Sequence, residues 1–417
     1  MAKSLYICYF GVREPLVQTQ VIPYLRELAK GGHELSLLTF EPSPFEKGRS
    51  ETEIREELQT QGIDWYWLRY HKRFSALATA YDIFRGTIFV RGLIRQKQLD
   101  ILHGRVHMPT LIGALARKFS RRKPKVLFDI RGFFPEEYTD AGIWPENGLL
   151  YRTAKRVERW LLEDSNGFVV LTEKARDILF PGSKESGVDK LGRPVEVIPC
   201  CVDFQRFEIV DPETRAETRA KLIANGRPIM VYVGSFGGWY LSDEMMDFTR
   251  AARIIDPRIF FLVLTQRDQE KVRKELLARG FSSEDFKVEG VLPKYMGQYL
   301  SACDVAISFI KPCYSKLASS PTKLAEYLAC GLPVVANSGV GDVDELISGK
   351  QVGVVFDDFN DQNYQDVFKL ILKMSGKNGI SEHCRQVAIE NFDLAAVGGA
   401  RYRRLYKNIL GDERDGG

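Results

Sequence analysis

The stretch 319–337 combines residue types that can hold an anion at the start of a helix. Two serines that can cap a helix precede Pro321, which suits the first helical position, and Gly331 is typical of a helix end. The backbone N–H groups of Thr322 and Lys323 would then point out of the helix start. The lysine ammonium and the positive end of the helix dipole lie beside them, so this spacing predicts a phosphate site.

Glu326 lies one turn after Lys323, on the same side of the predicted helix. Its carboxylate can accept hydrogen bonds from the two hydroxyls of a ribose, which extends the predicted phosphate site to a nucleotide site. The helix leads through Gly331 into an apolar run at Val334 that would support it from below. An ordinary α/β unit contains the same ingredients, and that alternative remains open on the spacing alone.

A glycine-rich loop follows the apolar run that starts at Ile229. Gly234, Ser235 and Gly237 would let the backbone approach a diphosphate closely, although a tight turn has the same composition. The loop contains no Lys or Arg, so Lys323 must supply most of the positive charge for a diphosphate. Arg267, at the end of a neighbouring apolar run, is a weaker substitute.

Asp129 and Arg131 are the best catalytic candidates in the first half of the chain. They close the apolar run that starts at Val126, and Gly132 allows a sharp turn there, so both side chains would emerge at the carboxyl end of a strand. A structural ion pair between the two is an equally good interpretation.

Four further residues are candidates for the acceptor side of a reaction. Gly11 and Gln18 belong to a loop after the first apolar run, His107 is expected in a loop, and Glu136 follows the Asp129 segment. His103 and His107 have the i, i+4 spacing of metal ligands, but no third ligand follows at a credible spacing, so no metal site is expected.

Apolar runs alternate with helical patterns along both halves of the chain, which predicts two doubly wound parallel-sheet domains. We expect an N-terminal domain at 1–205, a C-terminal domain at 206–390, and a helix at 391–417 that docks back on the first domain. The carboxyl ends of the strands in the two domains are expected to face a cleft. The expected strands are Leu5–Phe10, Leu35–Phe40, Ile101–His103, Val126–Asp129, Gly167–Leu171, Val195–Pro199, Ile229–Gly234, Phe260–Leu264, Val305–Phe309, Val334–Ala336 and Gly353–Phe356.

The composition limits the partners and the compartment of the protein. A net charge of +4 over 417 residues gives no reason to expect nucleic-acid binding. The segment from Arg117 to Lys125 concentrates basic residues without an acid and could contact an anionic membrane peripherally, although a solvated loop is the simpler interpretation. Seven irregularly spaced cysteines, read as free and mostly buried, and a first apolar run too short for a secretory signal predict a cytoplasmic location, with possible peripheral attachment to the inner membrane face.

The complete string from Pro321 to Ala336 (PTKLAEYLACGLPVVA) resembles the donor-site signature of retaining glycosyltransferase family 4, also described as glycosyl transferases group 1. The opening from Tyr9 to His33 resembles one branch of that family. The resemblance implies a GT-B fold and metal-independent transfer of a sugar, with retention of configuration, from a nucleoside diphosphate donor to a glycan or glycoconjugate. It also implies a base contact at Val291 and a sugar or acceptor contact at Asp129 and Arg131.

The chain departs from the family pattern at two places. Ala318 occupies the position of the first glutamate of the E-x₇-E pair that ends at Glu326, and the Gly234 loop has none of the usual cations. These departures leave a non-catalytic sugar-nucleotide-binding protein as an alternative to the transferase. A GT-B sugar-nucleotide epimerase, which would act on the donor without an acceptor, is a second alternative.

Overall fold

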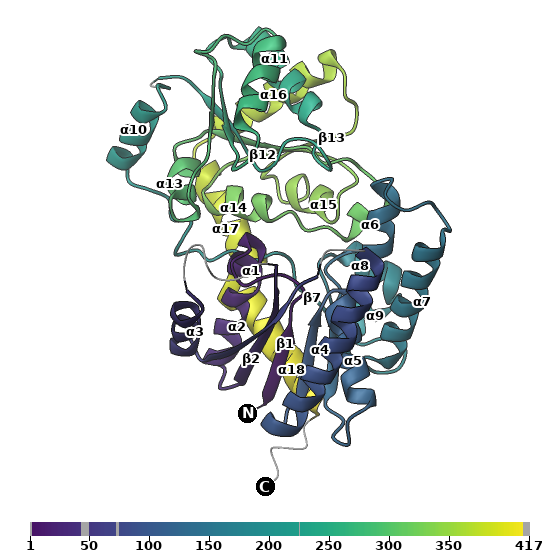
Figure 1. The fold of residues 1–417 in the computed structure, drawn as a ribbon. Coiled ribbons are helices and arrows are strands. Elements are labelled where there is room, and N and C mark those ends of the chain that lie inside the picture. The colour runs from purple at the N-terminus through teal and green to yellow at the C-terminus, as the bar shows by residue number, and fades with distance from the viewer. Residues whose placement is uncertain (1, 43–49, 72–74, 225, 412–417) are drawn as a thin grey trace. The chain divides into compact units, whose positions relative to one another are not determined.

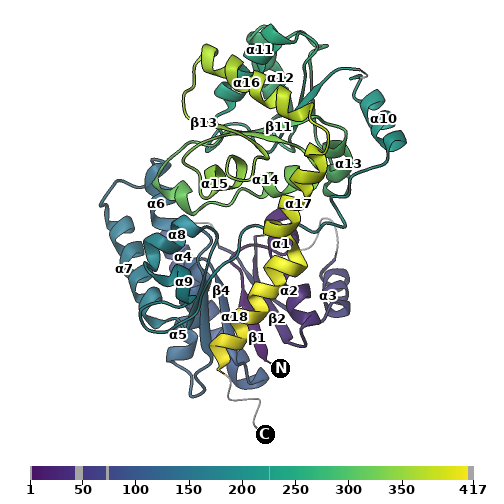
Figure 2. The same cartoon turned by 180° about the vertical axis from the view of Figure 1, so that it is seen from behind.

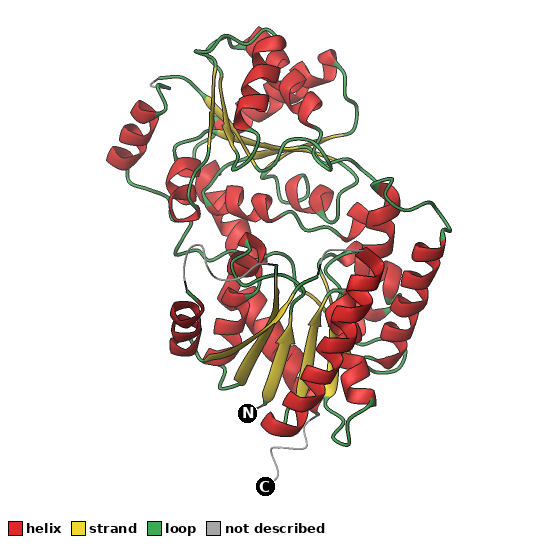
Figure 3. Ribbon diagram, in the orientation of Figure 1, coloured by secondary structure: helices red, strands yellow, loops and turns green. Residues whose placement is uncertain are grey.

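The computed structural model describes residues 2–42, 50–71, 75–224 and 226–411. The chain divides into two compact units, one made of Met1–Pro199 with Leu394–Gly417 and the other of Cys200–Asp393. Within each unit, helices cover both faces of one parallel sheet (Figures 1 and 3). This confirms the predicted fold class of two Rossmann-like domains.

The first unit contains seven strands among its described residues, in the order β3-β2-β1-β4-β5-β6-β7, and all neighbours are parallel. The order changes direction between β1 and β4, which is where doubly wound sheets bind ligands. The strands are β1 (Lys3–Ile7), β2 (Glu34–Glu41), β3 (Ile63–Arg69), β4 (Ile101–Arg105), β5 (Lys125–Asp129), β6 (Gly167–Val170) and β7 (Val195–Val197).

The helices of the first unit lie in two layers. Val90, Leu93 and Ile94 of the long helix α4 belong to one hydrophobic core with Leu5 and Ile7 of β1. The C-terminal helix α18 runs along the other face, beside α2 (Figure 2). The helices are α1 (Pro15–Gln20), α2 (Ile22–Lys30), α3 (Glu51–Thr60), α4 (Ser75–Lys97), α5 (His107–Lys118), α6 (Phe134–Asp140), α7 (Leu149–Asp164), α8 (Glu173–Leu179), α9 (Ser183–Ser186), the π-helical turn Leu394–Gly399 and α18 (Ala400–Leu410).

The second unit contains a six-stranded parallel sheet in the order β10-β9-β8-β11-β12-β13. Its order changes direction between β8 and β11. The central strands are buried on both faces, as in Phe260–Leu264, which explains why they read as continuous apolar runs. The strands are β8 (Ile229–Val233), β9 (Phe260–Leu264), β10 (Phe286–Glu289), β11 (Val305–Ser308), β12 (Val334–Asn337) and β13 (Gly353–Phe356).

The helices of the second unit follow the strands in the usual crossover pattern. Leu324 and Leu328 of α14 belong to one hydrophobic core, and Met245 and Phe248 of α11 belong to the core on the other side of the sheet. The helices are α10 (Pro212–Lys221), α11 (Ser242–Ile255), α12 (Gln269–Ala278), η1 (Pro293–Tyr295), α13 (Met296–Ser301), η2 (Tyr314–Ala318), α14 (Thr322–Ala329), α15 (Val343–Ile347), α16 (Asp361–Ser375) and α17 (Ile380–Phe392).

Two further predictions from the sequence concern the state of the cysteines and membrane-spanning helices. All seven cysteines are free, and all except the partly exposed Cys313 are buried, as the sequence predicted. Across the described ranges, no helix combines the length and the apolar character that crossing a bilayer requires.

Candidate functional site

The direction change between β8 and β11 brings the predicted donor residues of the second unit together. The Gly234 loop leaves the carboxyl end of β8, and the segment 309–318 leaves the carboxyl end of the neighbouring strand β11. These segments pair through Tyr240 and Ile310 in an antiparallel bridge. The tyrosine hydroxyl of Tyr327 in α14 accepts from the backbone N–H of Val233 at 2.7 Å, which holds the helix against the end of β8.

Lys323 is the buried cation at this point of the sheet. Its side chain is enclosed by two aromatic rings, with Nζ 3.7 Å from the ring centre of Tyr240 and 4.4 Å from that of Tyr232. Nζ also donates to the hydroxyl of Tyr232 at 3.2 Å, and this hydroxyl donates to the carbonyl oxygen of Ser235 at 2.7 Å. Burial lowers the pKa of Lys323 to about 7, because the charged form loses water, while the Glu326 carboxylate opposes that shift. Near neutral pH the side-chain amine of Lys323 can therefore take up a proton and become charged when an anion binds beside it.

Gly234 lies directly against this lysine. A Cβ at position 234 would be 2.9 Å from Lys323 Nζ, and the residue has φ +135°, which other residues rarely adopt. The glycine therefore allows the loop backbone and the ammonium to approach each other. Gly237, with φ +81°, donates its N–H to Ser242 Oγ at 2.6 Å and turns the loop back toward α11.

Lys316 is a second cation that the sequence analysis did not select. Its Nζ lies 3.9 Å from the ring centre of Trp239 in the glycine-rich loop, and the residue is buried. Lys316 was hard to select from the sequence, because it lies after β11 and is far along the chain from the glycine-rich loop after β8. Adjacent strands β8 and β11 place it beside the loop that lacks its own cation.

The start of α14 differs from the predicted cap. The helix begins at Thr322, Pro321 occupies the cap position, and no side chain bonds to the cap. The predicted serine cap is wrong because Ser320 Oγ accepts instead from the backbone N–H of Cys200 at 3.1 Å. Ala318, where the family pattern has a glutamate, is buried at the end of η2. Gly331, at φ +75°, follows the helix end as expected.

Glu326 is a half-buried residue of α14, one turn after Lys323. Burial of its carboxyl group raises the pKa of Glu326 to about 7, and the positive charges of Arg206 and Lys323 oppose this shift. Lys323 and Glu326 therefore change charge in the same pH range, three residues apart on one helix.

The other predicted donor residues lie on neighbouring strand ends. Val291, after β10, is buried, and its carbonyl oxygen accepts from Gln266 Nε2 at 2.5 Å. Arg267, after β9, is exposed, and its backbone N–H donates to Thr265 Oγ1 at 3.4 Å. Gln266 is thus a residue that sequence analysis missed, and it ties the loop after β9 to the predicted base-binding turn.

Asp129 and Arg131 form the ion pair that the sequence offered as the alternative interpretation, while their catalytic role stays a prediction. Asp129 is fully buried and accepts from Arg131 Nε at 2.9 Å and from the hydroxyl of Tyr402 in α18 at 2.9 Å. Arg131 Nη2 donates to the same tyrosine hydroxyl at 2.8 Å. Burial alone would raise the pKa of Asp129, but Arg131, His103 and Arg105 hold it well below its usual value. The pair anchors the C-terminal helix to the strand ends.

His107 and Glu136 also have partners inside the first unit. His107 does not lie in a loop as predicted; it is the first residue of α5, buried, with Nε2 2.9 Å from Glu158 Oε2. Glu136 accepts from the hydroxyl of Tyr151 at 3.1 Å and pairs with Lys155 at 3.0 Å. Both side chains are therefore paired within the first unit, and their acceptor-side roles stay predictions.

The loop after β1 has a structural reason for its glycine. A Cβ on Gly11 would be 2.7 Å from Glu41 Oε2, and the next residue, Val12, donates its N–H to Glu41 Oε1 at 2.8 Å. Gln18 is exposed, and its Nε2 donates to the carbonyl oxygen of Val12 at 2.7 Å. These contacts close the loop upon itself.

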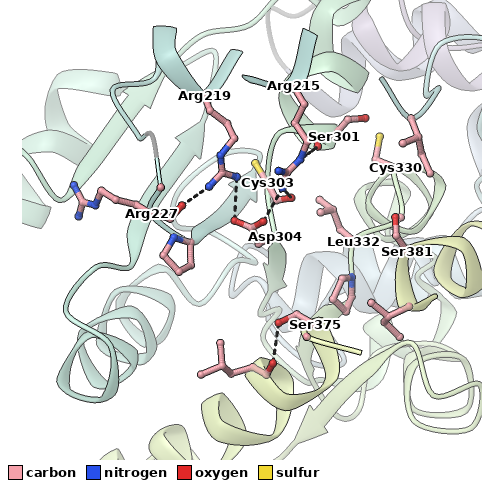
Figure 4. Close-up of a pocket in the computed structure, with 18 residues that line it drawn as sticks. Arg215, Arg219, Arg227, Ser301, Cys303, Asp304, Cys330, Leu332, Ser375 and Ser381 are labelled. Carbon is pink, nitrogen blue, oxygen red and sulfur yellow. Dashed lines mark hydrogen bonds and ion pairs between the residues drawn. The ribbon is translucent and has the colours of Figure 1, made fainter. Parts of the chain in front are cut away.

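A pocket of about 730 Å³ opens at the opposite edge of the second sheet (Figure 4). It lies at the amino ends of β8, β11 and β12, and Arg215 and Arg219 both pair with Asp304 in it. These arginines also donate to backbone carbonyls of Ser301 and Ala302. The two arginines therefore stabilise the starts of the strands, and none of the predicted donor-binding residues lines this pocket.

Two family models match the chain, one in each half. The model described as Glycosyltransferase Family 4 matches residues 17–206, and the model described as Glycosyl transferases group 1 matches residues 227–373. No curated protein matches the sequence significantly.

Several solved structures share the fold over nearly the whole chain. Sucrose-phosphate synthase from Thermosynechococcus elongatus is 16% identical, with 97% of this chain and 99% of that chain covered and a TM-score of 0.72. Anabaena HepE, solved with UDP and glucose, is 14% identical, with 97% and 100% covered and a TM-score of 0.69. WaaG, described as a glycosyltransferase of lipopolysaccharide biosynthesis, is 16% identical, with 96% and 98% covered and a TM-score of 0.63. With a glycosyltransferase model in each unit and this fold, the chain is a glycosyltransferase of the GT-B type.

Proposed function

We propose that the protein transfers a sugar from a nucleoside diphosphate donor to a glycan or glycoconjugate acceptor, with retention of configuration and without a metal. The observation that carries the proposal is the buried ammonium of Lys323 beside Gly234, at the direction change of the second sheet. The relatives of similar fold include HepE solved with UDP-glucose and a trehalose-6-phosphate protein from E. coli bound with UDP-2-fluoro glucose. Uridine nucleotides are therefore the first donors to test.

The donor would bind along the carboxyl edge of the second sheet. The diphosphate would lie against Lys323 and the backbone of Gly234, Ser235 and Gly237, with Thr322 at the helix start and Lys316 as a second cation. Glu326 would accept from the ribose hydroxyls, and Val291 would contact the base. As the glycosidic bond breaks, negative charge develops on the leaving diphosphate, and a buried cation stabilises it more than a solvated one does.

Retention follows from front-face attack in this proposal. Ala318 stands where a carboxylate would lie beside the transferred sugar, so no covalent intermediate is assigned to that position. The leaving phosphate would instead accept the proton of the attacking hydroxyl. The charge of Lys323 then serves bond breaking directly, since negative charge develops on the departing phosphate before that phosphate takes up the proton of the acceptor.

A thermal-unfolding screen of nucleoside diphosphates and their sugars tests the donor site. A ligand at about 100 times its Kd should stabilise the protein by about 2.7 kcal/mol, which corresponds to several degrees in Tm. We expect one base series to stabilise the protein, with the diphosphate stronger than the monophosphate. Absence of any shift across all bases would contradict a donor site.

The affinity for a nucleoside diphosphate should be greatest near pH 7. Above pH 7, Lys323 is neutral in the free protein and must take up a proton to meet the diphosphate, so affinity should fall by up to about tenfold per pH unit. Below pH 7, Glu326 is protonated and loses its ability to accept from both ribose hydroxyls. Calorimetry at about pH 8 in buffers of different ionisation enthalpy should show proton uptake on binding. A constant Kd from about pH 6 to 9 would contradict these roles.

A further inference from the structure

The helix α4, labelled in Figure 1, carries a row of large exposed apolar side chains on its outer side. Leu77, Tyr81, Phe84 and Ile88 are 75%, 48%, 62% and 56% exposed. Their spacing of four, three and four residues places them along one side of the helix. Single exposed apolar residues are ordinary, but a contiguous row of four indicates a surface that another body covers.

This row is separate from the side of α4 that builds the core. Val90, Leu93 and Ile94 pack with the strands, and each is at most 4% exposed. The helix therefore has an apolar inner side and an apolar outer side. Packing within the first unit explains only the inner one.

The charges that accompany the apolar row have one sign. Arg85, Arg91 and Arg95 are exposed along α4, and the guanidinium of Arg85 lies 6.0 Å from the ring centre of Tyr81. The only acid in α4 is Asp82, which is 1% exposed and bonded to the hydroxyl of Tyr9 at 2.7 Å. The exposed face thus combines apolar side chains with cations and presents no carboxylate among the described side chains of α4.

The basic stretch from Arg117 to Lys125 adjoins the end of this helix. Arg122 donates to Gln98 Oε1 at 3.2 Å and to the carbonyl oxygen of Leu99 at 2.9 Å. Other cations of the stretch hold the fold, since Arg117 bonds to Asn166 and Lys123 Nζ donates to two carbonyl oxygens at the end of α5. Arg122 also pairs with Asp100 at 2.8 Å, so the stretch is not a free basic patch by itself.

We propose that the outer face of α4 is a docking surface for a bilayer with anionic headgroups. The apolar row would enter the boundary between headgroups and acyl chains, and the three arginines would pair with lipid phosphates. Tyr81 suits that boundary because its ring is apolar and its hydroxyl is polar. The proposal rests on α4 alone and does not depend on the donor chemistry of the second unit.

Vesicle co-sedimentation of the full chain tests the surface. The protein should bind vesicles of phosphatidylcholine mixed with phosphatidylglycerol, bind pure phosphatidylcholine much less, and lose affinity as salt is raised. The double variant Phe84→Ser/Ile88→Ser should bind the mixed vesicles with an affinity that is lower by about tenfold or more. The matched control Ile254→Ser/Leu277→Ser removes two exposed apolar residues of the second unit, which are 66% and 50% exposed, and should bind like the parent protein.

A charge variant gives an independent check. Arg85→Ser/Arg91→Ser should remove the preference for phosphatidylglycerol and most of the salt dependence. Binding of neither vesicle by the parent protein, or equal binding by all variants, would overturn the proposal. Light scattering without lipid tests whether a second copy of the chain covers this face instead. A parent dimer that Phe84→Ser/Ile88→Ser converts to a monomer would show that it does, and would also overturn the bilayer proposal.

Discussion

Replacing Lys323 with methionine should lower kcat/KM for the nucleotide sugar by about 10²–10³-fold. The methionine keeps most of the apolar stem between Tyr232 and Tyr240 and removes only the charge. Removing one preorganised charge that stabilises a developing anion costs about 3–4 kcal/mol in other enzymes, which is the origin of the expected factor. Steady-state kinetics with the donor found in the screen would measure it.

The same variant should be more stable than the parent protein. Because the folded-state pKa of Lys323, about 7, is below the unfolded value, the folded protein is penalised most at and below pH 7, and its stability rises as pH increases toward the unfolded value. Lys323→Met should therefore raise the free energy of unfolding by about 2 kcal/mol or more at pH 7, with a smaller gain at higher pH. Lys369→Met, at a lysine with a 56% exposed side chain paired with Asp366, should change neither turnover nor stability appreciably. An unchanged kcat/KM in Lys323→Met would contradict the role of the ammonium.

Asp129→Ala should destabilise the first unit by about 3–5 kcal/mol. The substitution leaves the buried guanidinium of Arg131, whose side chain is 5% exposed, without its carboxylate, and it removes the acceptor for Tyr402. Chemical denaturation followed by aromatic fluorescence would measure the loss.

The control is Asp64→Ala, which breaks the exposed pair with Lys97 at 2.7 Å and should cost about 1 kcal/mol or less. Tyr402→Phe should fall between the two, since it keeps the Asp129–Arg131 pair but removes one hydroxyl. If Asp129→Ala were as stable as Asp64→Ala while turnover disappeared, the assignment of Asp129 as an anchor would be wrong and the predicted catalytic role would be supported.

Most of the sheet was predictable because its strands are buried on both faces. Runs such as Phe260–Leu264 and Val305–Ser308 are continuous and apolar, and they mark parallel strands wherever they occur. The strands β3 and β10 and the helix α4 were not predicted. The helix α4 has apolar residues on two opposite sides, which hides the helical period in the sequence. One of these two sides is the exposed outer row.

The candidate site was predictable where neighbouring residues of one helix carry the chemistry. Lys323 and Glu326 needed only helical spacing, whereas the rings of Tyr232 and Tyr240 reach Lys323 from about ninety positions away. Asp129 shows the same limit: its pair with Arg131 could be foreseen from the spacing, whereas its second partner Tyr402 is 273 residues distant in the chain. Spacing in the sequence identifies side chains that share a helix or a strand. Only the folded chain shows which distant side chains become their hydrogen-bonding and charge partners.

Calorimetric titration with the strongest nucleoside diphosphate from the screen, at about pH 7, tests the central assignment most directly. The parent protein and Lys369→Met should bind with the same Kd. The Kd of Lys323→Met should be higher by about 30-fold or more, which corresponds to the loss of one charge-assisted contact of about 2 kcal/mol. Equal affinity of Lys323→Met and the parent protein would show that the diphosphate does not meet this ammonium.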